Sequence, residues 1–209
     1  MEILLNILFW TLLILPPVFA IRAFLRHAWI LGTIILILQA CVVALGILTV
    51  RESARQSKCM ANLHGPGKSM KIYSIDNSAC FPSNWAGFSN YANNARMYVC
   101  FSSGTTTGSE ANVDQWTDYV LVANLQEGDP AQAVLAFCPP KDHKGDGGFI
   151  LFIEGSVEWT PSEEFGALLS DPCRFFGTDD VAKVIELQHR VMIRPPYDST
   201  LRLPPVKHP

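Results

Sequence analysis

Two runs of hydrophobic residues occupy the first fifty positions of the chain. The second run, residues 28–50, has no charged side chain and a single amide, Gln39. As a helix it would reach about 34 Å, which exceeds the hydrocarbon core of a bilayer, about 30 Å thick. A buried core helix of this composition would need a large protein around it, and the rest of the chain is too small. We therefore expect residues 28–50 to cross a membrane.

The first run, residues 3–21, is interrupted by Asn6 and by Pro16-Pro17. It can be a second span kinked at the prolines, which membrane helices tolerate. It can also be a cleavable signal sequence, because Val18-Phe19-Ala20 resembles a small-residue cleavage site. A signal sequence normally begins with positive charge, whereas this chain begins Met1-Glu2. We therefore favour a second span and keep the signal sequence as the alternative.

After the membrane segment, residues 51–76 predict a polar helix that continues the second run. Its apolar positions recur at helical spacing: Met60, Leu63, Gly67, Met70 and Tyr73. Pro66 stands between two glycines and lacks a backbone donor, so a kink is expected there. The following residues, 77–115, are rich in Ser, Asn, Gly and Thr but contain aromatic residues. They predict a long irregular segment that packs on the domain through its rings.

Strand chemistry dominates the next part of the chain. Residues 119–125, 133–138 and 149–153 are short apolar runs separated by Gly, Pro and Asp. Glu154-Gly155 then predicts a tight hairpin into residues 156–160, with glycine supplying the positive backbone angle. Together with the long helix, these strands predict an α+β fold with a small antiparallel sheet.

Two helices are expected after the hairpin. Thr160, Pro161 and Glu163 resemble a capping box at the start of the first, and Phe165, Leu168 and Leu169 would form its buried face. The second is expected over residues 179–190 with Thr178 as its cap, followed by a proline-rich tail. The predicted organisation is a membrane anchor (1–50), an α+β domain (51–170) and a C-terminal helix and tail (171–209).

Charge and cysteine content narrow the possible environments. From Arg51 onward the chain carries 14 Lys and Arg against 18 Asp and Glu, which argues against a nucleic-acid partner. Basic residues flank the second run on both sides, so counting them does not fix its orientation. Five cysteines lie outside the membrane segment, namely Cys59, Cys80, Cys100, Cys138 and Cys173. That density is typical of an oxidising compartment and favours an extracytoplasmic domain.

Candidate catalytic chemistry is sparse. The chain has no Gly-x-Ser-x-Gly elbow, no His-Glu-x-x-His, no phosphate loop and no Cys-x-x-Cys. Asp142, His143 and Asp146 form the one constellation that resembles a site. A calcium ion bound by Asp142 and Asp146 would need six to eight oxygen ligands, and this loop offers few. We therefore expect a polar turn, no cofactor and no enzyme activity.

The order of motifs resembles the type IV pilin and type II secretion pseudopilin superfamily, and within it the branch that ends in a His…Asp-Gly hairpin box. The resemblance begins with the basic helix after Arg51 and its Cys-x-x-Asn-Leu signature, made here by Cys59, Asn62 and Leu63. Phe81-Pro82 and Tyr98-Val99-Cys100 follow in the family's order. The box itself comprises Cys138-Pro139-Pro140, His143, Gly145-Asp146-Gly147-Gly148, Glu154-Gly155 and Val157-Glu158-Trp159.

This resemblance implies a membrane-anchored, non-enzymatic structural protein of a bacterial secretion or filament system. Its partners would be membrane lipid, other pilin-like subunits and inner-membrane components of the system, with the main domain on the periplasmic side of the inner membrane. It also implies that Cys59 faces the cysteine-bearing strand, whereas Cys80 and Cys100 flank the irregular segment in the sequence. We therefore expect Cys100 to form a disulfide with Cys80 or with Cys59. Related pseudopilins hold calcium in a C-terminal loop, the place of Asp142 and Asp146 here.

Two features depart from the family pattern. The family's basic leader, glycine cleavage point and Phe-Thr-Leu-Ile-Glu start do not occur in this sequence. Glu154 and Ser156 stand where the box usually has Asp and His. The first departure supports an alternative function, a membrane-tethered extracytoplasmic binding module whose pilin-like domain no longer assembles.

Overall fold

The structure is a computed structural model that describes residues 29–92 and 94–194. The chain divides into two compact units, which meet between Ala54 and Arg55. The first hydrophobic run (3–21) and the proline-rich tail lie outside the described residues. The interpretations of that run as a span or a signal sequence therefore stay predictions.

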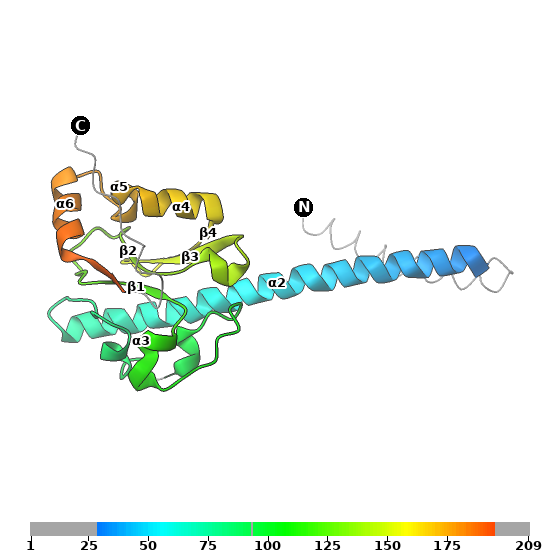
Figure 1. Cartoon of the computed structure of the whole chain (residues 1–209), viewed down its shortest axis with the longest axis horizontal. Helices are drawn as coiled ribbons and strands as arrows, with labels where there is room; N and C mark the ends of the chain where they lie inside the picture. Colours follow the sequence, from blue (N-terminus) through cyan, green and yellow to red (C-terminus); the bar gives the residue numbers. More distant parts are fainter. Residues whose placement is uncertain (1–28, 93, 195–209) are drawn as a thin grey trace. The chain divides into compact units, whose positions relative to one another are not determined.

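Helix α2 runs without interruption over Trp29–Asp76 and so carries the second hydrophobic run directly into the polar helix, as expected (Figure 1). Pro66 lies inside it and does not end it. From Gly32 the helix contains an 18-residue window with a mean hydropathy of 2.6, none of which is buried. By length and composition α2 is thus able to cross a membrane. Its exposed large apolar residues before Arg51 include Trp29, Ile30, Ile34, Leu36, Ile37, Leu38, Val42, Leu45, Ile47, Leu48 and Val50.

The second unit contains a five-stranded antiparallel sheet in the order β4-β3-β2-β1-β5. Its strands are β1 (Val120–Ala123), β2 (Val134–Cys138), β3 (Gly147–Phe152), β4 (Val157–Pro161) and β5 (Met192–Arg194). The first four confirm the predicted strands, and the α+β class is confirmed with them. The edge strand β5 was not expected.

Both faces of the sheet are covered. The second half of α2 packs on one face, where Gly67 lies so close that a Cβ would be 2.8 Å from a methyl carbon of Leu151. Helix α4 (Ser162–Ser170) covers the other face through Phe165, whose ring centroid lies 5.6 Å from that of Phe137 (Figure 1). Strands β1, β2 and β3 are buried along their whole length, as this double covering requires.

Two of the predicted helix caps are wrong. Thr160 does not cap α4, because it belongs to β4 and pairs with Gly148; Pro161 occupies the cap position without a side-chain hydrogen bond. After the short helix α5 (Pro172–Phe175), helix α6 (Val181–Arg190) is capped by Asp180 and not by Thr178. The expected buried face of α4 is correct for Phe165 and Leu168, and Leu169 is half-buried.

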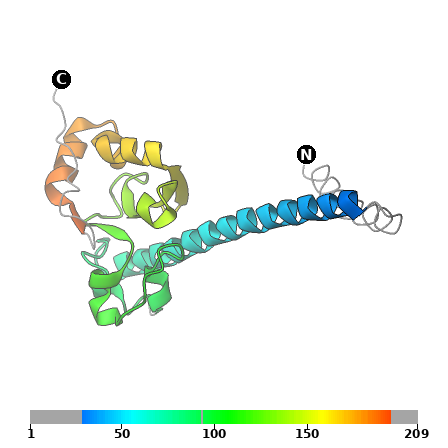
Figure 2. The same ribbon diagram turned by 45° about the vertical axis from the view of Figure 1, so that its right-hand side comes forward.

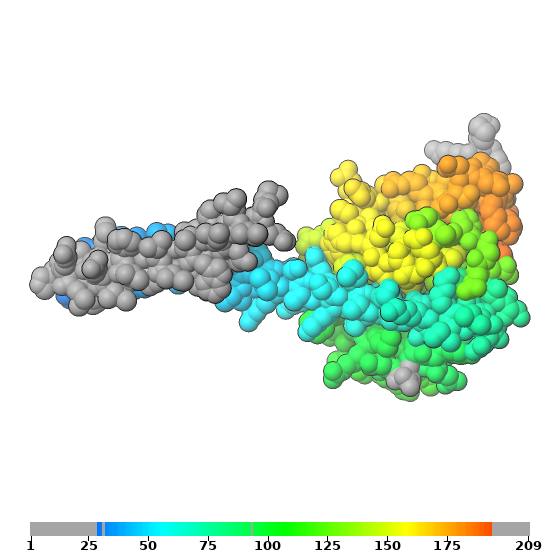
Figure 3. Space-filling view, turned by 180° about the vertical axis from the view of Figure 1, so that it is seen from behind, coloured from blue at the N-terminus to red at the C-terminus, as the bar shows by residue number. Residues whose placement is uncertain are grey.

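The irregular segment after α2 packs as predicted on its aromatic rings. It contains three 3-10 helices and one short α-helix: η1 (Ala86–Phe88), η2 (Ala95–Tyr98), η3 (Glu110–Asn112) and α3 (Val113–Trp116) (Figure 2). Phe81, Trp85 and Phe88 are buried. The space-filling view places the second half of α2 between this segment and the sheet with its covering helices (Figure 3).

Candidate metal centre

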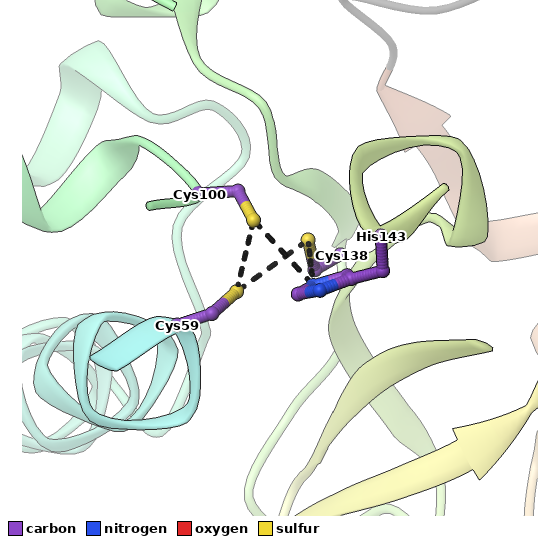
Figure 4. Close-up of side chains that lie close together, drawn as sticks. All are labelled: Cys59, Cys100, Cys138 and His143. Atoms are coloured by element: carbon purple, nitrogen blue, oxygen red, sulfur yellow. Dashed lines mark hydrogen bonds between the residues drawn. The ribbon is translucent and has the colours of Figure 1, made fainter. Parts of the chain in front are cut away.

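Four metal-ligating side chains converge inside the second unit, between α2, the sheet and the irregular segment (Figure 4). They are Cys59 on α2, Cys100 just after η2, Cys138 at the end of β2, and His143 at the end of the 3-10 helix η4 (Pro140–His143). None is more than 1% exposed. We call this set the Cys3His cluster.

The ligand atoms of the Cys3His cluster lie within 4.8 Å of one another. Cys59 Sγ lies 3.2 Å from Cys100 Sγ and 3.7 Å from Cys138 Sγ. His143 Nε2 lies 3.4 Å from the sulfurs of both Cys100 and Cys138. The four atoms therefore form a compact group around a common centre, as a single metal ion would require.

Asn62 explains how the first two cysteines meet. It follows Cys59 by three residues, so both side chains leave the same face of α2. The Asn62 amide donates to the backbone oxygens of Arg96 (3.1 Å) and Val99 (3.0 Å). These bonds hold the segment that carries Cys100 against the helix, and Leu63 beside them is fully buried. The Cys-x-x-Asn-Leu signature thus has a structural cause.

Asp118 holds the backbone at Cys100 through its carboxylate. Its buried carboxylate accepts from the Cys100 N–H at 2.8 Å and from the hydroxyls of Ser103 and Thr105 at 2.5 and 2.6 Å. The Tyr119 hydroxyl donates to the Val99 oxygen at 3.1 Å and lies 3.7 Å from Cys59 Sγ. Cys100 is consequently held by hydrogen bonds independent of any thiol contact.

The His143 ring is oriented by aromatic packing. Its centroid lies 5.4 Å from that of Phe149 and 5.2 Å from that of Trp159, both in edge-to-face geometry. The end of η4 requires two left-handed residues, Lys144 (φ 59°) and Gly145 (φ 88°). Nε2 faces the sulfurs, while Nδ1 is buried without a hydrogen-bond partner in the described part of the chain. This ring position leaves Nε2 as the ligating nitrogen.

The glycines of the hairpin box allow the close approach of strands around the site. A Cβ on Gly148 would collide with the backbone oxygen of Cys138 and lie 2.8 Å from the Phe165 ring. A Cβ on Gly147 would collide with the backbone oxygen of Thr160 and with Trp159. Gly155, at φ 99°, serves the hairpin turn instead, with open space around it. Glu154 accepts from Gln132 and Ser156 at the surface.

The thiols of the cluster differ in pKa. The pKa of Cys100 lies well below its usual value, because the thiols of Cys138 and Cys59 hydrogen-bond to it. The pKa of Cys59 is raised, chiefly by its hydrogen bond to Cys100, and that of Cys138 is raised chiefly by burial. Burial, followed by the charges of Asp118 and Cys100, raises the pKa of Asp142 to about 7. The contacts among the three thiols therefore favour the thiolate form at Cys100 over the other two.

The expectation that the protein holds no cofactor is corrected by this geometry, because a buried Cys3His cluster is able to bind a metal ion. The calcium candidates do not form a site of their own. Asp142 is buried with a carboxylate oxygen 3.8 Å from Cys138 Sγ, whereas Asp146 is exposed. In the described residues, the Cys3His cluster is the one grouping of His, Cys, Asp and Glu side chains placed to hold an ion.

The expected disulfide at Cys100 is likewise corrected. Cys59 and Cys100 are neighbours, as the resemblance implied, but their sulfurs are 3.2 Å apart and all cysteines in the described residues are free. Cys138 and His143 lie in the same group, and a Cys59–Cys100 disulfide would not require either of them. Cys80 lies elsewhere, in an isolated bridge with Gln126, and its thiol contacts the backbone oxygen of Ser78.

Comparison of the chain with protein-family models, curated proteins and solved structures finds no match. The sequence alone indicates Cys59 and Cys100 as disulfide candidates and His143 as part of a polar turn, and not as metal ligands. Cys138 is noted there only in the cysteine count and as part of the box. The available signal was the His five residues after Cys138, together with four more cysteines outside the membrane segment.

Proposed function

We propose that this chain is a membrane-anchored, pilin-like structural protein of the bacterial cell envelope. Helix α2 inserts into the membrane, and the domain that begins at Arg55 lies on the extracytoplasmic side. The protein performs no catalysis, and it associates through its apolar helix with pilin-like subunits or with inner-membrane components of a secretion or filament system.

One observation carries this proposal: the two halves of α2 differ in polarity and exposure. Its first half is apolar and exposed, whereas Cys59, Leu63 and Met70 in its second half are fully buried in the core of the α+β domain. A single helix that is lipid-compatible at one end and part of a domain core at the other favours a tethered structural unit. The ordered motifs of the pilin-like resemblance support the same function.

A structural role also suits the polar groups in the core. The four members of the Cys3His cluster are shielded from water, so a substrate has no evident access to them. Closed sites of this ligand type are typically structural. The cysteine content no longer supports the extracytoplasmic side, since the same residue types serve metal binding in reducing compartments. That placement now rests on the resemblance.

Thiol labelling tests the orientation. Thr106 is exposed in the irregular segment, and Thr106→Cys in a Cys80→Ser/Cys173→Ser background supplies a reporter. We expect an impermeant maleimide to label it in cells whose outer membrane is permeabilised. Protection until the inner membrane is lysed would place the domain in the cytoplasm and refute this part of the proposal.

Cross-linking tests assembly. Cys41 is exposed on the apolar half of α2, and Leu36→Cys and Val42→Cys place thiols on two other sides of the helix. In a Cys41→Ala/Cys80→Ser/Cys173→Ser background, a thiol restored at one of these positions at a time should give disulfide-linked dimers in oxidised native membranes at one or more of them, and the background itself should give none. Monomers at every position would instead favour the tethered binding module that does not assemble.

A further inference from the structure

We propose that Cys59, Cys100, Cys138 and His143 bind one Zn²⁺ ion, which fastens helix α2 and the Cys100 segment to the sheet. This site goes beyond the proposed function and does not depend on it. It is assigned from the positions of the four ligand atoms and from their chemical type.

The distances fit a tetrahedral zinc ion. Zinc–sulfur bonds of about 2.3 Å and zinc–nitrogen bonds of about 2.0 Å place sulfurs about 3.8 Å apart and each sulfur about 3.5 Å from the nitrogen. Four of the six separations between the ligand atoms are close to these values: Cys59 Sγ lies 3.2 and 3.7 Å from the other two sulfurs, and His143 Nε2 lies 3.4 Å from those same two sulfurs. All four ligand atoms lie within 4.8 Å of one another, so shifts of up to about an ångström would seat the ion. A disulfide would need sulfurs about 2.0 Å apart and would leave Cys138 and His143 without a role.

The ligand set selects the metal. Three thiolates and an imidazole are soft and borderline donors, whereas Ca²⁺ and Mg²⁺ prefer oxygen ligands. Iron–sulfur clusters generally use four cysteines. Four protein ligands also fill a tetrahedral shell, leaving no position for water or substrate, which is the pattern of a structural zinc site. A catalytic site would keep one position open.

Hydrogen bonds and aromatic contacts around the Cys3His cluster hold its ligands in place. Asn62 and Asp118 hold the segment around Cys100 through backbone contacts, and Phe149 and Trp159 hold the ring of His143. Because supporting contacts of this kind orient metal ligands, only side-chain shifts of up to about an ångström are needed to accept the ion. The ion joins three segments that meet only through folding: α2, the Cys100 segment and the β2–η4 connection.

Metal content tests the assignment. The full-length chain is produced without a polyhistidine tag, purified in detergent under reducing conditions and analysed by mass spectrometry of its elements. We expect about one zinc ion per chain. Cys100→Ser and His143→Gln should lose the ion, whereas the matched controls Cys80→Ser, Cys173→Ser and His189→Gln should keep it. Equal loss in the controls would overturn the site.

Cobalt keeps the proposal testable if a ligand variant fails to fold. Zinc is removed from the wild-type chain, reduced protein is titrated with Co²⁺, and the visible spectrum is recorded. We expect the intense bands of tetrahedral cobalt with a thiolate-to-metal charge-transfer band, saturating at one ion per chain and abolished by competing zinc. A weak octahedral spectrum would refute the site. A Cys59–Cys100 disulfide, in protein isolated from its native membranes without zinc, would refute it equally.

Discussion

Asn62 shows how one side chain can connect two distant parts of the chain. It sits on α2 beside Cys59, and its amide satisfies two backbone oxygens in the segment that leads to Cys100. In an Asn62→Ala variant both carbonyl oxygens lose this donor, because alanine has no side-chain amide. The bond to Arg96 is exposed and the bond to Val99 is partly buried, so each contributes about 0.5–1.5 kcal/mol to stability.

We therefore predict that Asn62→Ala lowers the free energy of unfolding by about 1–3 kcal/mol. It should also weaken metal binding about tenfold, because Cys100 loses its support against the helix. Asn90→Ala, at an exposed position, is the control and should change neither quantity. Denaturant unfolding of the fragment from Arg55 and competition with a zinc chelator measure the two effects. An unchanged stability would show that the two hydrogen bonds do not hold the segment.

At the same scale, the sequence indicates which residue types can bind a metal, but it does not show that these four residues lie together in the fold. Cys59 and Cys100 are 41 residues apart, and Cys59 and Cys138 are 79 apart. Neither periodicity nor turn chemistry reports contacts over such separations. The count of cysteines outside the membrane segment suggested an oxidising compartment, whereas three of them share one buried position with a histidine. Only the tertiary structure distinguishes these two uses.

Individual elements were easier to predict where local chemistry determines them. The β3–β4 hairpin follows from Glu154-Gly155, and Gly155 has the expected positive φ of 99°. The cap at Thr160 failed because this residue pairs with Gly148 in the sheet, so tertiary pairing overrode a local signal. Strand β5 escaped prediction because three residues, Met192–Arg194, are too few to show alternation.

Two glycines in neighbouring elements should respond oppositely to substitution. Gly155 has open space around it, so only its backbone angle limits the residue there. Gly155→Val should cost more than about 1 kcal/mol, since a β-branched residue fits a positive φ badly. Gly166 lies exposed inside α4 with equally open space, and Gly166→Ala should stabilise by about 1 kcal/mol through helix propensity. Thermal melts of the two variants decide this; a loss of stability in Gly166→Ala, or none in Gly155→Val, would contradict the assignment of these effects to the backbone.

On the scale of the whole molecule, the chain combines an exposed apolar helix segment with a domain that buries its apolar residues. The large side chains of α2 before Arg51 are mostly exposed and apolar, and a continuous hydrophobic surface of this kind is typical of a membrane or protein contact. The unit from Arg55 onward instead buries its aromatic and aliphatic residues in one core. Hydrophobic patterning predicts the contrast between an apolar N-terminal segment and a mixed domain, because that contrast depends on composition and not on long-range contacts.

The boundary between the two units gives the final prediction. A chain that begins at Ala28 retains α2 and should remain in membranes through an alkaline carbonate wash, since its apolar run is long enough to span the hydrocarbon core. A fragment that begins at Arg55 keeps the described core and should be soluble, folded and monomeric. Leu38→Arg, near the middle of the run, should weaken insertion by about 3 kcal/mol, whereas Leu38→Ile should leave it unchanged. Carbonate extraction and sedimentation of the four chains make the comparison. Release of the Ala28 chain with the soluble fraction would show that α2 does not span the bilayer, and an insoluble Arg55 fragment would show that the domain depends on the apolar half of its helix.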